Sequence, residues 1–514
     1  MNTTLRLLVK LLALTLALAF VAGAIAQDQP TYGGTLVVAY ETEPHSLAPW
    51  RSGDANAHRV YNALYDNLVE QLADLSIVPG LAHAWDVSDD GLVYTFYLRD
   101  DVTFHNGEPF DAEVAKWNMD RWASPPDGYI FGLTTDIVSS EVIDQYTLRV
   151  TLGAPDVKFL IDVSNKLRAV LPMGAVEDAG EAFSFNPVGT GPFKFDAWIT
   201  DSEIRLVRNE DYWQTDDQGN ALPYLDGIVF RTMPDSSTRH TALVTGEIDM
   251  DTIVGPENVA DAEARENLAV YNEPGVGYIA LRLLTTEPPL DDVRVRQAIA
   301  WAVDREAVNE AAFFGLAFPG STLYSSPTPG FDPDYEPYGR DLERARALLA
   351  EAGYAGGFDL QMIASSPVNQ IIAEVLQANL AEVGIRVSVQ LLERGSFLDG
   401  IVQRRHQSYV DRITGRTDPS DYYGHLECDA TYNGHDYCNP TVDQLALFDG
   451  RANFTDLLDP ERLALYRETE RMVMEDSPLV TLVHPPYVFS WNADAHGIVV
   501  TPAGRTFWTH AWKN

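Results

Sequence analysis

The chain has 514 residues, enough for about three domains of ordinary size, and 46% of them are hydrophobic, so intrinsic disorder is excluded. Acidic residues outnumber basic ones by 75 to 36, which gives a formal charge of −39. Such a surface argues against nucleic acid and anionic membranes as partners, because proteins that bind them carry basic patches. It keeps a protein soluble and is compatible with a saline environment.

The first 26 residues have the pattern of a secretory signal peptide. Arg6 and Lys10 precede an apolar run over 11–23, and Ala24-Ile25-Ala26 fits a cleavage site. We therefore expect an exported protein that is cleaved after Ala26. Because no cysteine follows that site, a lipoprotein anchor is not expected. Without this segment 34 basic residues face 75 acidic ones, a charge of −41.

The first half of the chain predicts several strands and a few helices. Apolar periodicity predicts a helix over 58–70, one face of which carries Tyr61, Leu64, Tyr65 and Leu68. Strands are predicted at 34–39, 92–98, 193–198, 204–208 and 224–232, with a strand or hairpin at 141–152. Asp111 is expected to cap a helix, and a helix over 238–245 is expected to end at Gly246.

The second half predicts a βαβ unit. The clearest helix covers 292–306, with Asp291 or Asp292 as its cap; other helices are predicted at 341–352, 369–383 and 460–474. Alternating apolar residues predict strands around Leu360 and Val387, on either side of the helix at 369–383. A strand, a helix and a strand of these lengths imply a parallel pair.

A turn rich in proline and glycine divides the chain. It reads Asn186-Pro187-Val188-Gly189-Thr190-Gly191-Pro192-Phe193-Lys194-Phe195. The prolines and glycines stop any element that precedes them, and Gly189 and Gly191 are expected to take positive φ. Pro192 then directs the chain into the strand at 193–198. From composition alone this is a surface turn before a strand.

The chain contains two cysteines, Cys428 and Cys438. Export favours a disulfide between them. His425 and His435 each precede one cysteine by three residues, so a Cys2His2 zinc site is a rival, although the spacing is unlike that of familiar zinc fingers. Free thiols are the third possibility.

The turn at 186–195 resembles the GTGPF turn of family 5 of the solute-binding proteins, the peptide- and nickel-binding components of ABC transporters. Further fragments resemble this family in the same order along the chain. They are Gly33-Gly34-Thr35-Leu36, Glu43-Pro44-His45-Ser46-Leu47-Ala48-Pro49, Tyr61-Asn62-Ala63-Leu64-Tyr65-Asp66, Phe104-His105-Asn106-Gly107-Glu108-Pro109-Phe110, Asn209-Glu210-Asp211-Tyr212-Trp213 and Val293-Arg294-Val295-Arg296-Gln297-Ala298-Ile299. Each fragment is short, and their common order carries the resemblance.

The resemblance implies an α/β fold with two lobes, of the periplasmic-binding-protein type (type II-like, cluster C), with an additional inserted α+β domain. The expected division is lobe I at 27–62, 187–277 and 485–514, the inserted domain at 63–186, and lobe II at 278–484. Crossing strands near 278–284 and His484-Pro485-Pro486 are expected to join the lobes. Some relatives also carry a cysteine pair at the place of Cys428 and Cys438, which favours the disulfide.

The resemblance also implies a set of ligand-binding residues. They lie in a first-lobe loop, in the inserted domain, ahead of and within an Asp-Pro pair, and near the last crossing: Glu43, His45, Ser46, Tyr129, Thr414, Gly415, Arg416, Asp418 and Tyr487. Each of them could instead pack locally.

Two departures from the family pattern argue against a simple dipeptide as ligand. Many peptide-binding relatives have an aspartate for the ligand amino group where this chain has Gly415 or Arg416. Dipeptide binders carry an arginine for the ligand carboxylate where this chain has Asn369-Gln370-Ile371. Arg416 is expected either to meet an anionic group of the ligand or to pair with Asp411 or Asp418.

The sequence favours a binding protein over an enzyme. It contains no G-x-S-x-G, H-E-x-x-H or G-x-x-x-x-G-K-[ST] motif, and no cofactor is expected. The resemblance implies a monomeric periplasmic protein that captures a peptide or peptide-like solute by hinge closure and delivers it to ABC permease subunits in the inner membrane. An oligosaccharide, another small organic solute, a nickel complex or a receptor role without transport are the alternatives.

Overall fold

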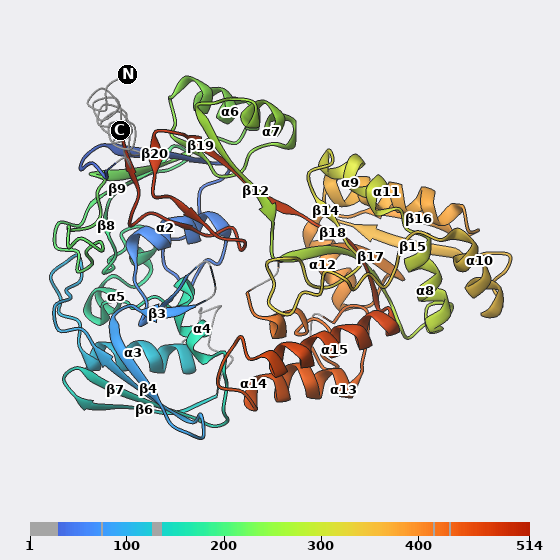
Figure 1. The fold of residues 1–514 in the computed structure, drawn as a ribbon, viewed down its shortest axis with the longest axis horizontal. Coiled ribbons are helices and arrows are strands. Elements are labelled where there is room, and N and C mark those ends of the chain that lie inside the picture. The colour runs from blue at the N-terminus through green and yellow to red at the C-terminus, as the bar shows by residue number, and fades with distance from the viewer. Residues whose placement is uncertain (1–28, 73, 75, 126–135, 415–416, 431–432) are drawn as a thin grey trace, which may run out of the picture.

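Two large mixed sheets and one small antiparallel sheet organise the computed structural model, which describes residues 29–72, 74, 76–125, 136–414, 417–430 and 433–514. In Figure 1 the first large sheet and the small sheet lie on the left, and the second large sheet lies on the right. Within the described part of the chain, no helix combines the length and the apolar character needed to cross a membrane.

The first sheet has seven strands in the order β12-β19-β11-β1-β10-β9-β8. In chain order they are β1 (Thr35–Tyr40), β8 (Phe193–Ile199), β9 (Glu203–Arg208), β10 (Gly227–Thr232), β11 (Met250–Asp251), β12 (Leu268–Pro274) and β19 (Pro486–Asn492). The helices that accompany this sheet are α2 (Ala55–Leu64), α6 (Ser236–Thr245) and α7 (Pro256–Glu263). β1 runs parallel to β10 and β11, and Leu36, Val38 and Phe230 lie in the core beneath it.

The small sheet has the order β4-β5-β7-β6 and lies between β1 and β8 in the chain. Its elements are β4 (Ala82–Val87), β5 (Val93–Leu98), β6 (Ile137–Asp144) and β7 (Thr147–Leu152), with α3 (Ala112–Ala123), α4 (Phe159–Ser164), α5 (Met173–Ala179), the 3-10 helices η1 (Lys166–Arg168) and η2 (Gly180–Ser184), and the pair β2 (Val69–Gln71) and β3 (Ile77–Pro79). Asp111 caps α3 by accepting from the N–H groups of Glu113 and Val114, as predicted. The hairpin at 141–152 is confirmed by β6 and β7.

The second sheet has the order β14-β18-β13-β17-β15-β16. Its strands are β13 (Gly277–Leu283), β14 (Phe318–Pro319), β15 (Asp359–Ala364), β16 (Arg386–Leu391), β17 (Ser408–Thr414) and β18 (Leu479–His484). Its helices are α8 (Val293–Ala302), α9 (Arg305–Phe313), α10 (Leu342–Glu351), α11 (Pro367–Ala381), α12 (Arg394–Val402), η3 (Pro419–Tyr422), α13 (Pro440–Asp443), η4 (Gln444–Asp449), α14 (Gly450–Ala452) and α15 (Pro460–Asp476). β15 and β16 are parallel and joined through α11, which confirms the βαβ unit.

Two crossings connect the large sheets. β12 continues through Gly275 and Val276 into β13, and β18 continues through Pro485 into β19. A Cβ on Gly275 would lie 2.8 Å from the Pro485 carbonyl oxygen, so the close approach of the two crossings requires glycine. The C-terminal residues return beside the first sheet in two short pairs, β20 (Ala495–His496) with β23 (Trp512–Lys513) and β21 (Val499–Val500) with β22 (Thr506–Phe507).

The prediction of positive φ in the dividing turn is wrong. Gly189 and Gly191 are absent from the residues with positive φ. Glycine is required here for space, because a Cβ on Gly189 would lie 2.0 Å from the Leu64 carbonyl oxygen and one on Gly191 would lie 2.5 Å from the Leu64 carbonyl carbon. The turn therefore packs directly on the last turn of α2, and the Gly191 N–H donates to the Leu64 carbonyl over 3.0 Å.

Two predicted helices have different ends in the structure. The helix at 58–70 is α2, which Asp54 caps and which ends at Leu64 because Tyr65 is extended. The helix at 292–306 is divided into α8 and α9. Asp304 is extended between them and accepts from the Ala307 N–H, so it starts a new helix instead of continuing the first.

Candidate functional site

A small pocket lies beside the crossings that connect the two large sheets. Its lining residues come from the end of β2, the crossing between β12 and β13, the loops before α10 and η3, and the turn between β21 and β22: Gln71, Leu72, Val276, Pro327, Thr417, Thr501, Pro502, Ala503, Arg505 and Phe507. Because both lobes contribute to the lining, a molecule in this pocket would contact both of them.

Gln71 supplies a polar group that is buried in this pocket. The Thr417 hydroxyl donates to Gln71 Oε1 over 3.2 Å and so joins the loop before η3 to β2. Gln71 Nε2 is buried and has no hydrogen-bond partner in the described part of the chain. A buried donor without a partner is unfavourable, so an acceptor group of a bound solute would stabilise this arrangement.

The sequence did not indicate Gln71 or the 501–507 segment as part of a site. Gln71 directly follows the predicted helix at 58–70, where no site was expected. The Pro502 and Gly504 turn signals were visible in the sequence, but the pairing that brings this turn to the crossing was not. The Val276 N–H donates to the Pro502 carbonyl over 3.0 Å and fixes the turn beside the crossing.

Asp418 holds the loop after β17 in place. Both of its carboxylate oxygens accept from Arg462 Nη2, at 2.9 and 2.8 Å, and the pair is buried. Oδ1 also accepts from the Ser420 N–H and hydroxyl. Burial alone would raise the pKa of Asp418, but Arg462 and Lys158 hold it below the usual range. Asp418 therefore stays charged and caps η3.

The rest of the predicted Asp-Pro loop begins at the crossing. Thr414 is the last residue of β17 and pairs with Gly277, the first residue of β13. Gly415 and Arg416 lie outside the described residues. Of the two carboxylates considered as partners of Arg416, Asp418 pairs with Arg462, and Asp411 lies 3.7 Å from Arg394 Nη1.

The three first-lobe candidates lie in the loop that follows β1. Glu43 Oε2 accepts from Trp198 Nε1 over 2.9 Å and from the Asp201 N–H over 3.0 Å, which ties the loop to β8. The Ser46 hydroxyl accepts from the Ala48 N–H over 3.0 Å and is buried, whereas His45 is exposed. None of these three side chains lines the pocket beside the crossings.

Tyr487 lies in β19 immediately after the second crossing. An added Cβ on Gly504 would meet its ring at 2.7 Å, so the ring packs against the turn that lines the pocket. The guanidinium of Arg412, which lies in β17 of the second sheet, is 5.6 Å from the centroid of the Tyr487 ring. Tyr129 lies outside the described residues. The structure thus brings Thr414, Asp418 and Tyr487 near the crossings, and ligand contact by all the candidates stays a prediction.

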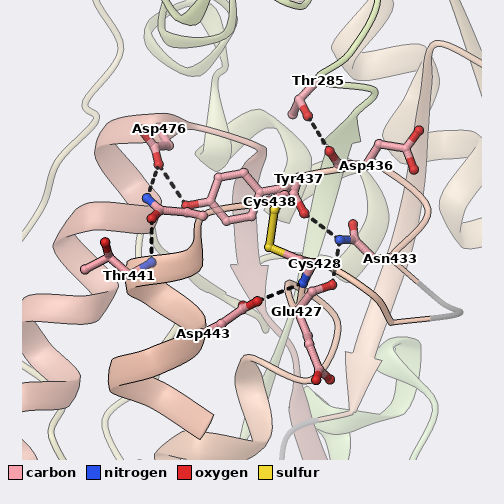
Figure 2. The surroundings of a disulfide bond; sticks show 11 residues. Thr285, Glu427, Cys428, Asn433, Asp436, Tyr437, Cys438, Thr441, Asp443 and Asp476 are labelled. Carbon is pink, nitrogen blue, oxygen red and sulfur yellow. Dashed lines mark hydrogen bonds between the residues drawn. A yellow bond between two sulfur atoms is a disulfide. The ribbon is translucent and has the colours of Figure 1, made fainter. Parts of the chain in front are cut away.

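A disulfide joins Cys428 to Cys438, as predicted (Figure 2). Because both sulfur atoms are in this bond, they are not available as the thiolate ligands of the Cys2His2 alternative. The Cys428 N–H donates to Asp443 on α13, and the Tyr437 hydroxyl donates to Asp476 at the end of α15 over 2.8 Å. The bridged loop is therefore attached to two of the helices that accompany the second sheet.

Curated proteins with similar sequences are named as binding proteins. The chain is 29% identical to the glutathione-binding protein GsiB of Salmonella paratyphi A, over 94% of this chain and 95% of that protein. It is 28% identical to a dipeptide-binding protein of Escherichia coli K12, over 96% of each chain.

Solved structures share the fold. HbpA2 from Haemophilus parasuis superposes with a TM-score of 0.84 at 26% identity, covering 94% of this chain and all of that one. A dipeptide-binding protein from Pseudoalteromonas sp. SM9913 in complex with Met-Leu has a TM-score of 0.78 at 25% identity with the same coverage. The expected two-lobe fold with its additional domain is thereby confirmed.

The family model of the bacterial extracellular solute-binding proteins, family 5, matches residues 76–433, which is more than half of the chain. The fragments quoted from the sequence, the two-lobe fold and the pocket between the lobes all agree with this match. The chain therefore belongs to family 5 of the bacterial extracellular solute-binding proteins.

Proposed function

We propose that this protein captures a peptide or peptide-like solute and delivers it to the permease of an ABC importer. The observation that carries the proposal is the pocket whose lining comes from both lobes, beside the two crossings that can serve as a hinge. A solute that contacts both lobes favours the closed form over the open one, because it makes its full set of contacts only there. The relatives named for glutathione and dipeptides support a short peptide.

Within this class we infer a ligand with an anionic group. Arg416 is a cation next to the place where peptide-binding relatives usually carry an acid for the ligand ammonium. A guanidinium repels that ammonium and favours a carboxylate or phosphate, or a neutral ligand rich in acceptors. A modified or acidic peptide satisfies this condition better than an unmodified dipeptide.

The proposed function includes the setting of the protein. The chain would be exported, cleaved after Ala26 and active as a monomer in the periplasm, where it would catalyse no reaction and need no cofactor. Lobe I (27–62, 187–277, 485–514), the inserted domain (63–186) and lobe II (278–484) would be its structural units, each built on one sheet. Closure of the lobes would present a surface to permease subunits of the inner membrane.

Calorimetric titration with a small panel of solutes tests this proposal. The panel contains reduced glutathione, Met-Leu, a tetrapeptide, a nickel–histidine complex and agropinic acid, the last two because solved neighbours hold them. We expect one-to-one binding of a peptide or peptide-like member. Binding of the nickel complex or agropinic acid alone would contradict a peptide ligand.

A pair of variants tests whether the solute binds in the pocket. Gln71→Leu removes the buried amide donor and should weaken the binding of the panel member by about 1 kcal/mol, roughly fivefold. The matched control is Gln218→Leu, because Gln218 is exposed in a turn of lobe I and is not a lining residue. Equal affinities of the two variants would exclude Gln71 from the site.

A further inference from the structure

Three consecutive residues of the inserted domain bind the opposite lobe. Asp156, Val157 and Lys158 precede α4, which Figure 1 shows next to α14 in the lower half of the molecule. Arg451 forms an ion pair with Asp156, with its Nε 3.2 Å from Asp156 Oδ1. The Val157 N–H donates to the Arg451 carbonyl over 3.0 Å, and the Lys158 ammonium pairs with the Asp421 carboxylate.

The four charged side chains of this contact are mostly shielded from water. Their exposed fractions are 6% for Asp156, 7% for Lys158, 14% for Asp421 and 21% for Arg451. The charges are complementary: Asp156 of the inserted domain meets Arg451 of lobe II, and Lys158 of the inserted domain meets Asp421 of lobe II. Burial alone would lower the pKa of Lys158, but Asp421, Asp162 and Asp418 raise it, so the ammonium stays charged.

The contact lies away from the crossings that join the lobes. In Figure 1 the crossings between β12, β19 and the second sheet are in the upper half, and α4 and α14 are in the lower half. The pocket is lined by residues of the crossings and of the loop before η3, the helix that carries Asp421. Opening the molecule about the crossings would therefore separate Asp156 and Lys158 from lobe II.

We propose that Asp156, Val157 and Lys158, together with Arg451 and Asp421, form a latch that holds the two lobes in the closed form. In the open form all four charges are hydrated. In the closed form their dehydration is offset only when both ion pairs form together, so the latch favours complete closure over partial closure. The apparent affinity for a solute then depends on the latch, because it scales with the fraction of molecules that can close. This last step rests on the proposed function.

Distance measurement by electron paramagnetic resonance tests the latch without any solute. Spin labels on Val138→Cys and Leu391→Cys, which are exposed in the inserted domain and in lobe II, report the distance between the two parts. Lys158→Met removes the ammonium that pairs with Asp421 in the closed form, whereas water solvates the Asp421 carboxylate in the open form. We expect the ratio of closed to open molecules to fall at least tenfold in Lys158→Met and in Arg451→Met.

Lys166→Met is the matched control. Lys166 is as buried as Lys158, with 5% of its side chain exposed. It pairs with Glu70 over 2.6 Å, and both residues lie in the inserted domain. This variant should lower the melting temperature and leave the ratio of closed to open molecules within twofold of the unsubstituted value. An equal shift in Lys166→Met and Lys158→Met would show a general loss of stability and would overturn the latch.

The double variant Lys158→Met/Asp421→Asn separates the latch from a folding defect. With both charges removed, no unpaired charge is buried on closure, so the double variant should close more often than either single variant. Additive losses would contradict the pairing. If no solute of the panel binds, the proposed function fails, and the distances between the spin labels still test the latch. If a solute binds, but the single variants keep the label distance and the affinity of the unsubstituted protein, only the latch fails.

Discussion

Glu470 on α15 is a buried acid whose ionisation should be visible in the stability of the protein. Its Oε1 accepts from the N–H groups of Leu323 and Tyr324 over 2.8 and 3.1 Å. Burial raises its pKa from 4.5 to about 7, and these two hydrogen bonds only partly oppose the shift. Since the pKa in the folded state is the higher one, the contribution to stability is complete below the unfolded pKa and is lost as the pH rises through about 7.

Glu470→Gln should remove this pH dependence. Between pH 5 and pH 8 the free energy of unfolding of the unsubstituted protein should fall by about 2 kcal/mol relative to that of the variant. Urea denaturation of both proteins across this range provides the measurement. Parallel curves would mean that Glu470 titrates alike in the folded and unfolded states.

Arg416 carries the prediction about ligand charge. If its guanidinium contacts the ligand in a buried site, Arg416→Ala should cost about 2–5 kcal/mol of binding free energy, through the partner left unpaired as well as the lost bond. Lysine should restore part of the loss, because it lacks the planar fork. Calorimetry with the solute that binds in the panel decides this. Unchanged affinity with a lowered melting temperature would assign Arg416 a structural role.

At the scale of single residues, the sequence predicted the contacts between residues that are close together in the chain. Asp111 and Asp292 could be identified as helix caps because a cap binds backbone N–H groups two or three residues ahead. The partner of Asp418 could not, since Arg462 is 44 residues away. Gln71 was missed for the same reason, because its contact with Thr417 spans 346 residues.

The dividing turn and α2 form one packed unit at the scale of elements. A methyl group on Gly191 would lie 2.5 to 2.7 Å from backbone atoms of Ala63, Leu64 and Tyr65. Gly191→Ala should therefore lower the free energy of unfolding by about 2–3 kcal/mol through overpacking.

Gly339→Ala is the control for this prediction. An added Cβ at Gly339 meets nothing within 4 Å, and its φ is not positive, so this variant should be neutral or slightly more stable. Urea denaturation compares the two variants. If both are equally stable, the close approach to α2 does not determine the choice of glycine in the turn.

Elements with a regular apolar period were predicted well, whereas interruptions inside them were not. The βαβ unit of β15, α11 and β16 followed from alternation and helical spacing. The break between α8 and α9 did not, because Asp304 suits a helix surface as well as a cap, and the choice depends on tertiary contacts such as the bond from its N–H to Asn379. The reason for glycine at 189 and 191 was likewise a contact with a distant element.

At the scale of the whole molecule, the lobes followed from the resemblance of ordered fragments and not from periodicity. Apolar periodicity predicted helices, strands and one parallel pair of strands, but it did not predict how the three sheets are arranged. The pocket and the latch join segments hundreds of residues apart, such as Asp156 with Arg451, and only the folded chain brings them together.

The central claim is that this protein binds a peptide or peptide-like solute between its lobes. Native mass spectrometry of the protein, purified from its own source without denaturation, tests this claim most directly. The account predicts one bound molecule per chain, released on denaturation, whose fragments contain amino acids and an anionic group. A protein that carries a sugar or a metal complex instead, or that stays empty and binds no peptide in the panel, would contradict it.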